Sequence, residues 1–237
     1  MTKTSGISAN RAVTMTEPAS VISGAKDHQG AAGVILAGGQ SRRMGGGDKC
    51  LRDLGGKPIL SHIIERAQGQ AGPLVLNANG DPARFGAFGL PVAADIIEGF
   101  AGPLAGILTG LDWVAAHAPE ARWMASFASD APFFPRDMVA RMLDAAEAAG
   151  ANLVCAESNG RSHPVFGLWS LSLRADLRRA VVEEGLRKVD LWTARHRLIT
   201  LPFAPVETGQ GTLDPFFNTN RPEDLVEAAR FAEAAAA

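Results

Sequence analysis

One stretch most constrains what this chain can fold into: VILAGGQSRRMGGGDK, from Val34 to Lys49. An apolar run stops at two adjacent glycines, and three cationic side chains follow before the stretch ends. The apolar run predicts a buried strand. Glycines beside positive charge are typical of a loop that wraps phosphate groups. The stretch therefore predicts a strand followed by a phosphate-binding loop.

Two familiar phosphate loops are excluded by the residues around this lysine. A P-loop places Gly directly before its Lys and Ser or Thr after it, whereas Asp48 precedes Lys49 and Cys50 follows it. A dinucleotide-binding loop needs the pattern G-x-G-x-x-G at a helix start, which the paired glycines do not provide. We expect a long, open loop across which Arg43 and Lys49 neutralise a triphosphate. In isolation the stretch fits a charged surface turn equally well, but its place after the first strand favours a ligand.

From Ala32 the chain alternates short apolar runs with longer amphipathic segments. This alternation predicts a mainly parallel sheet between two helical layers, a three-layer α/β/α Rossmann-like fold. The expected strands are 33–38, 73–79, 90–95, 123–130, 152–157, 162–170 and 196–203. The expected helices are 57–67, 102–117, 137–150, 171–185, 188–196 and 221–234.

Composition limits the class of protein. The chain has 237 residues, 46% of them hydrophobic, and a net charge of −2, which argues against a nucleic-acid or membrane surface as partner. The two cysteines form neither a metal-ligand pattern nor a disulfide framework, as expected of a reduced cytoplasmic protein. Residues 1–30 are rich in Ser, Thr, Gly and Ala and are expected to be a disordered tail. Residues 31–237 are expected to form a single domain.

The glycine-rich stretch resembles the signature of nucleotidyltransferases that pass a nucleoside monophosphate to a phosphorylated acceptor. Within that superfamily the chain is similar to the molybdenum cofactor guanylyltransferases, from residue 33 to about residue 229. The matching segments, in order, are LGGKPIL at Leu54, VLNAN at Val75, AGPLAG at Ala101, SDAPF at Ser129, HPVFGLW at His163 and FFNTNRPEDL at Phe216. The departures, Cys50 and the long N-terminal extension, fall on no expected ligand.

The resemblance implies a nucleotidyltransferase fold and an enzyme that uses GTP and Mg²⁺. Such an enzyme transfers GMP to the phosphate of molybdenum-molybdopterin, giving molybdopterin guanine dinucleotide and pyrophosphate. Molybdoenzyme apoproteins or their chaperones are further expected partners. The catalytic residues implied are Arg43, Lys49 and Asp130, with Asp130 also the metal ligand. The nucleotide-binding residues implied are Leu36, Ala37, Gly38, Gly39, Lys49, Asn77, Asp95 and Asp130, and the acceptor-binding residues are Asn218 and Asn220.

Each of these polar residues also has an ordinary structural interpretation. Asp130 can cap a turn, although a single carboxylate at a strand end also meets the needs of Mg²⁺, which binds one or two carboxylates together with substrate phosphates. Asp95 can be a solvated loop residue and Asn77 a turn former. Asn220 can cap the helix that follows it. His163 is expected to be structural and is left out of the catalytic set.

Two alternative functions remain open on the sequence. One is the same chemistry on other substrates, either a cytidylyltransferase for the same pterin or a sugar-phosphate nucleotidyltransferase. The GPLAG segment and the LAGG form of the loop favour guanine over these. The other alternative is a non-catalytic protein that binds nucleotide or cofactor and acts as a chaperone. The presence of both Lys49 and Asp130 argues against a purely binding role.

Overall fold

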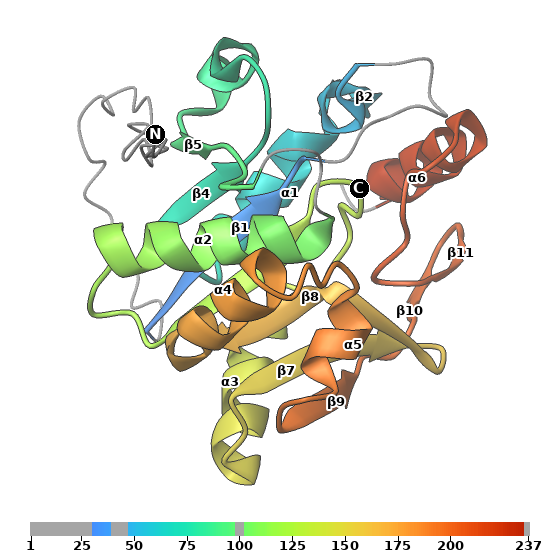
Figure 1. The fold of residues 1–237 in the computed structure, drawn as a ribbon. Coiled ribbons are helices and arrows are strands. Elements are labelled where there is room, and N and C mark those ends of the chain that lie inside the picture. The colour runs from blue at the N-terminus through green and yellow to red at the C-terminus, as the bar shows by residue number, and fades with distance from the viewer. Residues whose placement is uncertain (1–29, 39–46, 98–101, 235–237) are drawn as a thin grey trace, which may run out of the picture.

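A seven-stranded sheet forms the centre of the protein (Figure 1). The computed structural model describes residues 30–38, 47–97 and 102–234. The strand order is β5-β4-β1-β6-β8-β7-β9, and only β8 runs antiparallel to its neighbours. The strands are β1 (Ala31–Leu36), β4 (Leu74–Asn77), β5 (Val92–Ala93), β6 (Trp123–Ala128), β7 (Leu153–Ser158), β8 (Arg161–Ser170) and β9 (Leu198–Pro202).

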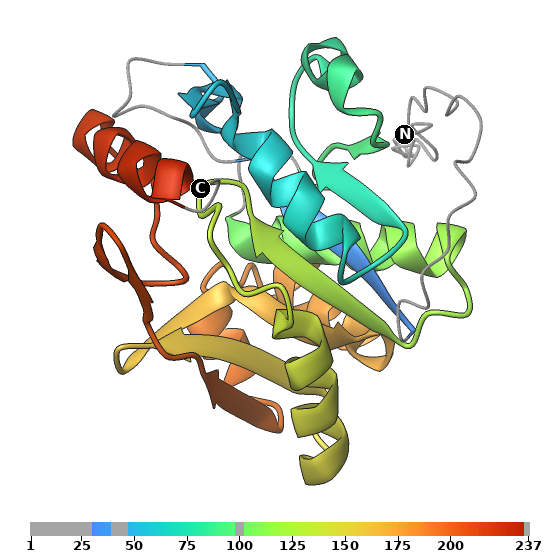
Figure 2. The same ribbon diagram turned by 180° about the vertical axis from the view of Figure 1, so that it is seen from behind.

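Helices cover both faces of this sheet. The α-helices of the described residues are α1 (Ile59–Gln68), α2 (Pro103–His117), α3 (Met138–Ala149), α4 (Arg174–Val182), α5 (Val189–Thr193) and α6 (Pro222–Ala234). Helices α2, α4 and α5 pack on one face and share one hydrophobic cluster (Figure 1). Helices α1 and α3 pack on the other face, as Figure 2 shows, in a second cluster that α6 also joins. The predicted three-layer α/β/α fold with a mainly parallel sheet is confirmed.

The predicted helical stripe on α1 is also confirmed. Ile59, Leu60, Ile63, Ile64 and Ala67 are all buried, because their spacing places them on one side of the helix. Helix α3 ends at Gly150, as the sequence predicts, and this residue adopts a left-handed backbone conformation with φ 58°.

Helix α2 lies against β1 because two of its glycines carry no side chain. A Cβ atom on Gly110 would lie 2.8 Å from both Val34 Cβ and Met124 Sδ. A Cβ atom on Gly106 would overlap Asn77 Oδ1. Atoms this close would clash, since ordinary contacts between carbon atoms are about 3.5–4.0 Å. The two glycines therefore set the separation of α2 from the sheet.

The parallel pairing brings several strand ends to one edge of the sheet. Leu36, the last residue of β1, pairs with Asn77 of β4 on one side and with Ala128 of β6 on the other. The strand order turns back at β1, since the chain first adds β4 and β5 and later adds β6 on the opposite side. Open α/β sheets bind ligands outside the carboxyl ends of strands at such a point. The sequence predicts Asp95 and Asp130 as the last residues of strands, whereas β5 and β6 end earlier, at Ala93 and Ala128, so both aspartates lie in the loops just beyond them.

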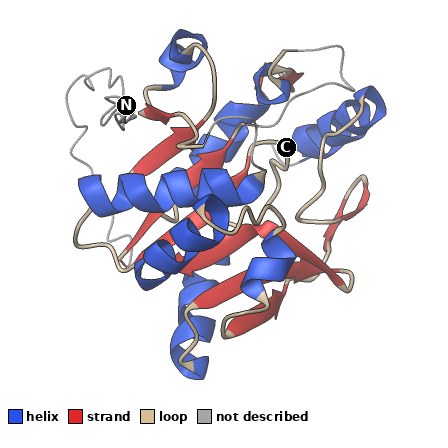
Figure 3. Cartoon of the chain, viewed as in Figure 1, coloured by secondary structure: helices blue, strands red, loops and turns tan. Residues whose placement is uncertain are grey.

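The small elements were not predicted from sequence (Figure 3). They comprise β2 (Asp53–Leu54) with β3 (Lys57–Pro58), β10 (Val206–Thr208) with β11 (Gly211–Leu213), and the 3₁₀ turns η2 (Lys49–Leu51), η3 (Pro82–Phe88) and η4 (Leu171–Leu173). Strands β2 and β3 are joined by two glycines with φ of 65° and 87°, the geometry of a tight hairpin turn. Two helices are shorter than the sequence predicts: α4 replaces the predicted helix 171–185, and α5 replaces the predicted helix 188–196. No helix in the described ranges is long and apolar enough to span a membrane.

The packing of α2 on β1 can be tested with Gly110→Ala. The added methyl overlaps both Val34 and Met124, which costs about 2–3 kcal/mol, the upper part of the range for an overpacked core, while the better helix propensity of alanine returns roughly 1 kcal/mol. We expect urea denaturation to show a net loss of about 1–2 kcal/mol in the free energy of unfolding. Gly86→Ala is the control, because a Cβ atom there meets nothing within 4 Å. An equally stable Gly110→Ala variant would contradict this account of the glycines.

Candidate active site

An amide–carboxylate cluster lies beyond β4 and β5. Asn77 is 2% exposed, and its Nδ2 donates to Asp95 Oδ1 at 2.9 Å and to the carbonyl of Ala93 at 3.2 Å. Asn79 Nδ2 donates to Asp95 Oδ2 at 2.8 Å, and the amide of Asp95 donates to Asn79 Oδ1 at 2.8 Å. The carboxylate is thus held by two side-chain amides in a fixed orientation. We call Asn77, Asn79 and Asp95 the amide–carboxylate cluster.

Gly38 lies beside this cluster. A Cβ atom at residue 38 would stand 3.5 Å from Asn79 Nδ2, 3.7 Å from Asn77 Oδ1 and 3.9 Å from Asp95 Oδ2. These are ordinary van der Waals distances, so a methyl group fits the protein but takes space beside the cluster. The start of the glycine loop and the ends of β4 and β5 therefore form one surface.

An ion pair joins the other end of the glycine loop to β6. Lys49 Nζ lies 2.6 Å from Asp130 Oδ2, although the two residues are 81 positions apart in the chain. The same ammonium donates to Asn220 Oδ1 at 2.7 Å. The Lys49 and Asp130 side chains are 18% and 24% exposed, so both remain accessible to a ligand. We call Lys49, Asp130 and Asn220 the charged cluster.

The segment before α6 is fixed to the loop after β6. Both the amide and the hydroxyl of Thr219 donate to the carbonyl of Asp130, at 2.8 Å and 3.0 Å. The Asp224 carboxylate accepts from the amides of Asn220 and Arg221, both at 2.8 Å. Helix α6 begins at Pro222, so Asp224 lies in its first turn and accepts from the preceding amides as the acid of a capping box does. Arg221, not Asn220, is the residue directly before the helix, and the Asn220 side chain accepts from Lys49. The capping interpretation of Asn220 is therefore wrong.

Arg84 links the two sides of the site. Its Nε donates to Asp48 Oδ2 at 2.5 Å, next to Lys49, and its Nη2 donates to the carbonyl of Asn79. Its Nη1 donates to the carbonyl of Asp81 at 2.6 Å. One guanidinium thus ties the end of the glycine loop to the segment that carries the amide–carboxylate cluster.

Comparison with known proteins agrees with this arrangement. Residues 33–197 match the protein family described as "MobA-like NTP transferase domain". A molybdenum cofactor guanylyltransferase of Bradyrhizobium sp. (strain ORS 278) is 55% identical over 200 residues, which cover 84% of this chain and 92% of the relative. The chain belongs to the molybdenum cofactor guanylyltransferase family.

Solved structures share the fold of this family at low sequence identity. The molybdopterin-guanine dinucleotide biosynthesis protein A of Archaeoglobus fulgidus superposes with a TM-score of 0.65 at 20% identity, covering 85% of this chain and 98% of that one. Rv0371c of Mycobacterium tuberculosis, crystallised in complex with manganese, superposes with a TM-score of 0.60 at 18% identity, covering 84% and 98% of the two chains.

The structure brings together most residues that the family resemblance implies. Leu36, Ala37 and Gly38 run from the end of β1 toward the amide–carboxylate cluster. Gly39 and Arg43 lie outside the described residues. Asn218 is half-buried and makes no hydrogen bond to another described residue. Sequence reasoning missed the residues that only fix others, because their partners are distant in the chain. These residues are Asp48, Asn79, Arg84, Thr219 and Asp224.

The charged cluster fits a divalent cation of the oxygen-binding kind. Within the described ranges no group of three or more His, Cys, Asp or Glu side chains could hold a metal by itself. Asp130 supplies one hard, partly exposed carboxylate, and Mg²⁺ binds through one or two carboxylates plus substrate phosphates and water. Cys50 is an unsuitable ligand, because burial and the nearby Asp48 charge raise the pKa of its thiol to about 12.

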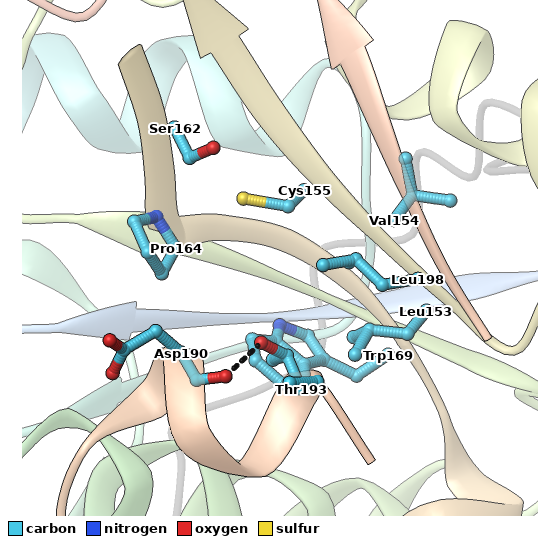
Figure 4. A pocket seen from close by; sticks show the side chains of 10 residues that line it. Leu153, Val154, Cys155, Ser162, Pro164, Trp169, Asp190, Thr193 and Leu198 are labelled. Carbon is cyan, nitrogen blue, oxygen red and sulfur yellow. Dashed lines mark hydrogen bonds between the residues drawn. The ribbon is translucent and has the colours of Figure 1, made fainter. Parts of the chain in front are cut away.

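A cavity of about 160 Å³ lies elsewhere, between β7, β8, β9 and α5 (Figure 4). Its walls are mainly apolar, and none of the residues implied by the family resemblance lines it. Ligand pockets for drug-sized molecules are typically 300–1,000 Å³, so the cavity is too small for a nucleoside triphosphate. The cavity is separate from the candidate active site. Cys155 lines it, and burial raises the pKa of this thiol to about 11.

Both cysteines should therefore be unreactive in the folded protein. At pH 8 a thiol with a pKa near 12 has a thiolate fraction on the order of one in ten thousand, and both side chains are buried. We expect iodoacetamide to label Cys50 and Cys155 at least ~100-fold more slowly in the native protein than in urea, as followed by mass spectrometry. Rapid native labelling of Cys50 would show that its surroundings stabilise the thiolate.

Proposed function

We propose that this chain transfers GMP from GTP to the terminal phosphate of molybdenum-molybdopterin, giving molybdopterin guanine dinucleotide and pyrophosphate. The observation that carries the proposal is the meeting of Lys49 and Asp130, beside the amide–carboxylate cluster, in a chain 55% identical to a molybdenum cofactor guanylyltransferase. A lone nucleotide-binding module would need a binding surface, but it would not need this charged cluster beside that surface.

The amide–carboxylate cluster is the proposed site of the nucleoside. Its side-chain amides and carboxylate offer both donors and acceptors in fixed positions, and guanine presents a carbonyl acceptor and an amino donor. Gly38 leaves room for the ligand to approach the cluster closely. Polar groups placed in this way discriminate strongly, because a wrong ligand leaves them unpaired.

The charged cluster is the proposed site of the phosphates. The reaction joins two anions, so charge neutralisation and positioning should supply most of the rate enhancement. The Lys49 ammonium, with Arg43 from the glycine loop, would offset charge on the departing pyrophosphate. Lys49 donates to Asp130 and Asn220. GTP would therefore exchange these protein partners of the ammonium for phosphate oxygens.

Asp130 is the proposed ligand of a divalent cation, and we assign that cation as Mg²⁺. A structural relative crystallised with manganese supports the use of a divalent ion by this fold. Such an ion would hold triphosphate oxygens and withdraw charge from them. Asp130 is suited to this role because its carboxylate remains partly exposed at the carboxyl edge of the sheet.

The acceptor phosphate needs no general base, since its oxygens are already ionised near neutral pH. His163, which the sequence analysis leaves out of the catalytic set, is held by contacts within the protein. Burial lowers the pKa of His163, a shift that the Asp214 charge opposes, and its ring nitrogen contacts Ser158 at 2.7 Å. Asn220 and Asn218 are the proposed contacts to the acceptor, with Asn220 the better supported because it reaches Lys49.

The decisive assay measures pyrophosphate release from GTP and Mg²⁺ in the presence and absence of molybdenum-molybdopterin. We expect release only with both substrates, and formation of the guanine dinucleotide product. Equal or faster release with CTP would identify a cytidylyltransferase. Nucleotide binding without any release would identify a binding protein or chaperone.

Asp130→Asn tests the metal-binding role. The substitution keeps the size of the side chain and removes its charge, so we expect guanylyl transfer to fall by at least ~100-fold. GTP affinity in the absence of metal should change little, as measured by calorimetry. Asp144→Asn, at an exposed position of α3, is the matched control and should keep full activity. Near-normal turnover of Asp130→Asn in saturating Mg²⁺ would remove Asp130 from the essential ligands.

Gly38→Ala tests base selection. The methyl group fits beside the amide–carboxylate cluster without a clash in the protein, so the fold should be retained, but the space for a purine is reduced. We expect the catalytic efficiency with GTP to fall roughly tenfold, about 1.4 kcal/mol, and the low activity with CTP to fall less. The measured quantity is the ratio of efficiencies with GTP and CTP. The same ratio in parent and variant would show that residue 38 does not select the base.

A further inference from the structure

A polar cluster around the buried Ser158 lies at the tip of the β7–β8 hairpin, apart from the amide–carboxylate cluster and the charged cluster. The hairpin turns through Asn159 and Gly160, whose φ angles are 50° and 71°. Asn-Gly in this conformation is the favoured two-residue hairpin turn. Ser158, the last residue of β7, is 2% exposed. A buried hydroxyl needs hydrogen-bond partners, and Ser158 finds two of them.

The first partner of Ser158 is Asp214, which lies between β11 and α6. Ser158 Oγ donates to Asp214 Oδ1 at 2.7 Å, and Asn159 Nδ2 donates to Asp214 Oδ2 at 3.1 Å. The amide of Phe216 donates to Asp214 Oδ1 at 2.9 Å, and the amide of Phe217 donates to the Asp214 carbonyl at 3.0 Å. One carboxylate therefore joins the hairpin tip to the segment that leads into α6.

The second partner of Ser158 is His163, and the hydrogen count fixes the tautomer of that ring. The single hydroxyl hydrogen of Ser158 goes to Asp214, because an ionised carboxylate only accepts. His163 Nε2, 2.7 Å from Ser158 Oγ, must therefore carry the hydrogen that Ser158 accepts. The His163 ring also stacks on Phe216 at a centroid distance of 4.6 Å. Hairpin and segment are thus in contact through both polar and aromatic groups.

The segment held in this way carries the acceptor side of the candidate site. Five residues after Asp214, Thr219 donates to the carbonyl of Asp130. The next residue, Asn220, accepts from Lys49. Hydrogen bonds hold both Asp214 and Thr219. The short stretch of chain between these two residues is therefore anchored at both ends.

We propose that Ser158, His163 and Asp214 are positioning residues for the acceptor half of the reaction. They hold residues 214–220 at the position where Asn220 meets Lys49, and they touch neither substrate. This inference rests on the proposed function, because it assumes that the segment binds the phosphorylated pterin. Its consequence is selective: disturbing the hairpin tip should weaken use of the acceptor while the amide–carboxylate cluster keeps its affinity for GTP.

Ser158→Ala is the first test, because it removes the central hydroxyl of the unit. We expect KM for molybdenum-molybdopterin to rise about tenfold, with kcat reduced less and the Kd for GTP within about twofold of the parent. Ser170→Ala, at the far end of β8 where its hydroxyl contacts exposed Ser172, is the matched control and should change none of these. An unchanged KM for the acceptor, or an equal loss of GTP affinity, would overturn the inference.

Two substitutions of His163 separate positioning from direct contact with the substrate. Glutamine places an N–H where Nε2 stands and can still donate to Ser158, whereas asparagine reaches only as far as Nδ1. Both lose the stacking on Phe216, so that loss is common to the pair. A positioning role predicts that His163→Gln keeps a lower acceptor KM than His163→Asn. The opposite order would mean that Nδ1 contacts the acceptor, and the positioning assignment would be wrong.

Hydrogen exchange tests the same unit without any turnover. The amides of Phe216 and Thr219 are protected by Asp214 and Asp130, so we expect both to exchange at least ~10-fold faster in Ser158→Ala than in the parent. Unchanged protection would overturn the inference whatever the activity. The two proposals can fail separately. If the parent protein were inactive with GTP and pterin but these amides exchanged faster in Ser158→Ala, the proposed function would be wrong. The link from Ser158 through Asp214 to residues 214–220 would still be supported.

Discussion

The position of β1 between β4 and β6 is the constraint on which the candidate site depends. Parallel pairing on both sides aligns the carboxyl ends of three strands, so residues remote in the chain arrive at one edge. Gly106 and Gly110 of α2 preserve this arrangement, since they let the helix lie close to β1 and Asn77. A side chain at either glycine would push α2 away from β1 and from the end of β4.

The charged cluster places opposite charges together before any substrate is bound. An exposed ion pair contributes little to stability, and a deeply buried one costs desolvation. Lys49 and Asp130 are partly exposed, so they avoid the larger cost and remain open to exchange. In the proposed function each group exchanges its partner for a stronger one, a phosphate for the ammonium and a cation for the carboxylate. In the free protein, the pair and Asn220 hold each other in position.

Local patterns predicted most of the sheet and the helical layers. The stripe on α1 and the glycine after α3 depend on neighbours within a few positions, which the sequence displays directly. The family resemblance supplied most of the residues of the candidate site. What could not be predicted are the contacts that fix those residues, such as Arg84 with Asp48 or Asp214 with Ser158. These pairs depend on how separate elements fold together, and no local spacing signals them. For the same reason, no local pattern links Asn220 to Lys49.

The late position of Asn220 in the chain has a consequence for biosynthesis. A chain leaves the ribosome from its N-terminus, so Lys49 and Asp130 emerge well before the segment that completes their cluster. Thr219, which anchors that segment, follows Asp130 by 89 positions. A nascent chain therefore contains Lys49 and Asp130 before Asn220 has been synthesised. A chain whose synthesis stops between these positions lacks Asn220 beside Lys49, and with it one of the proposed contacts to the acceptor.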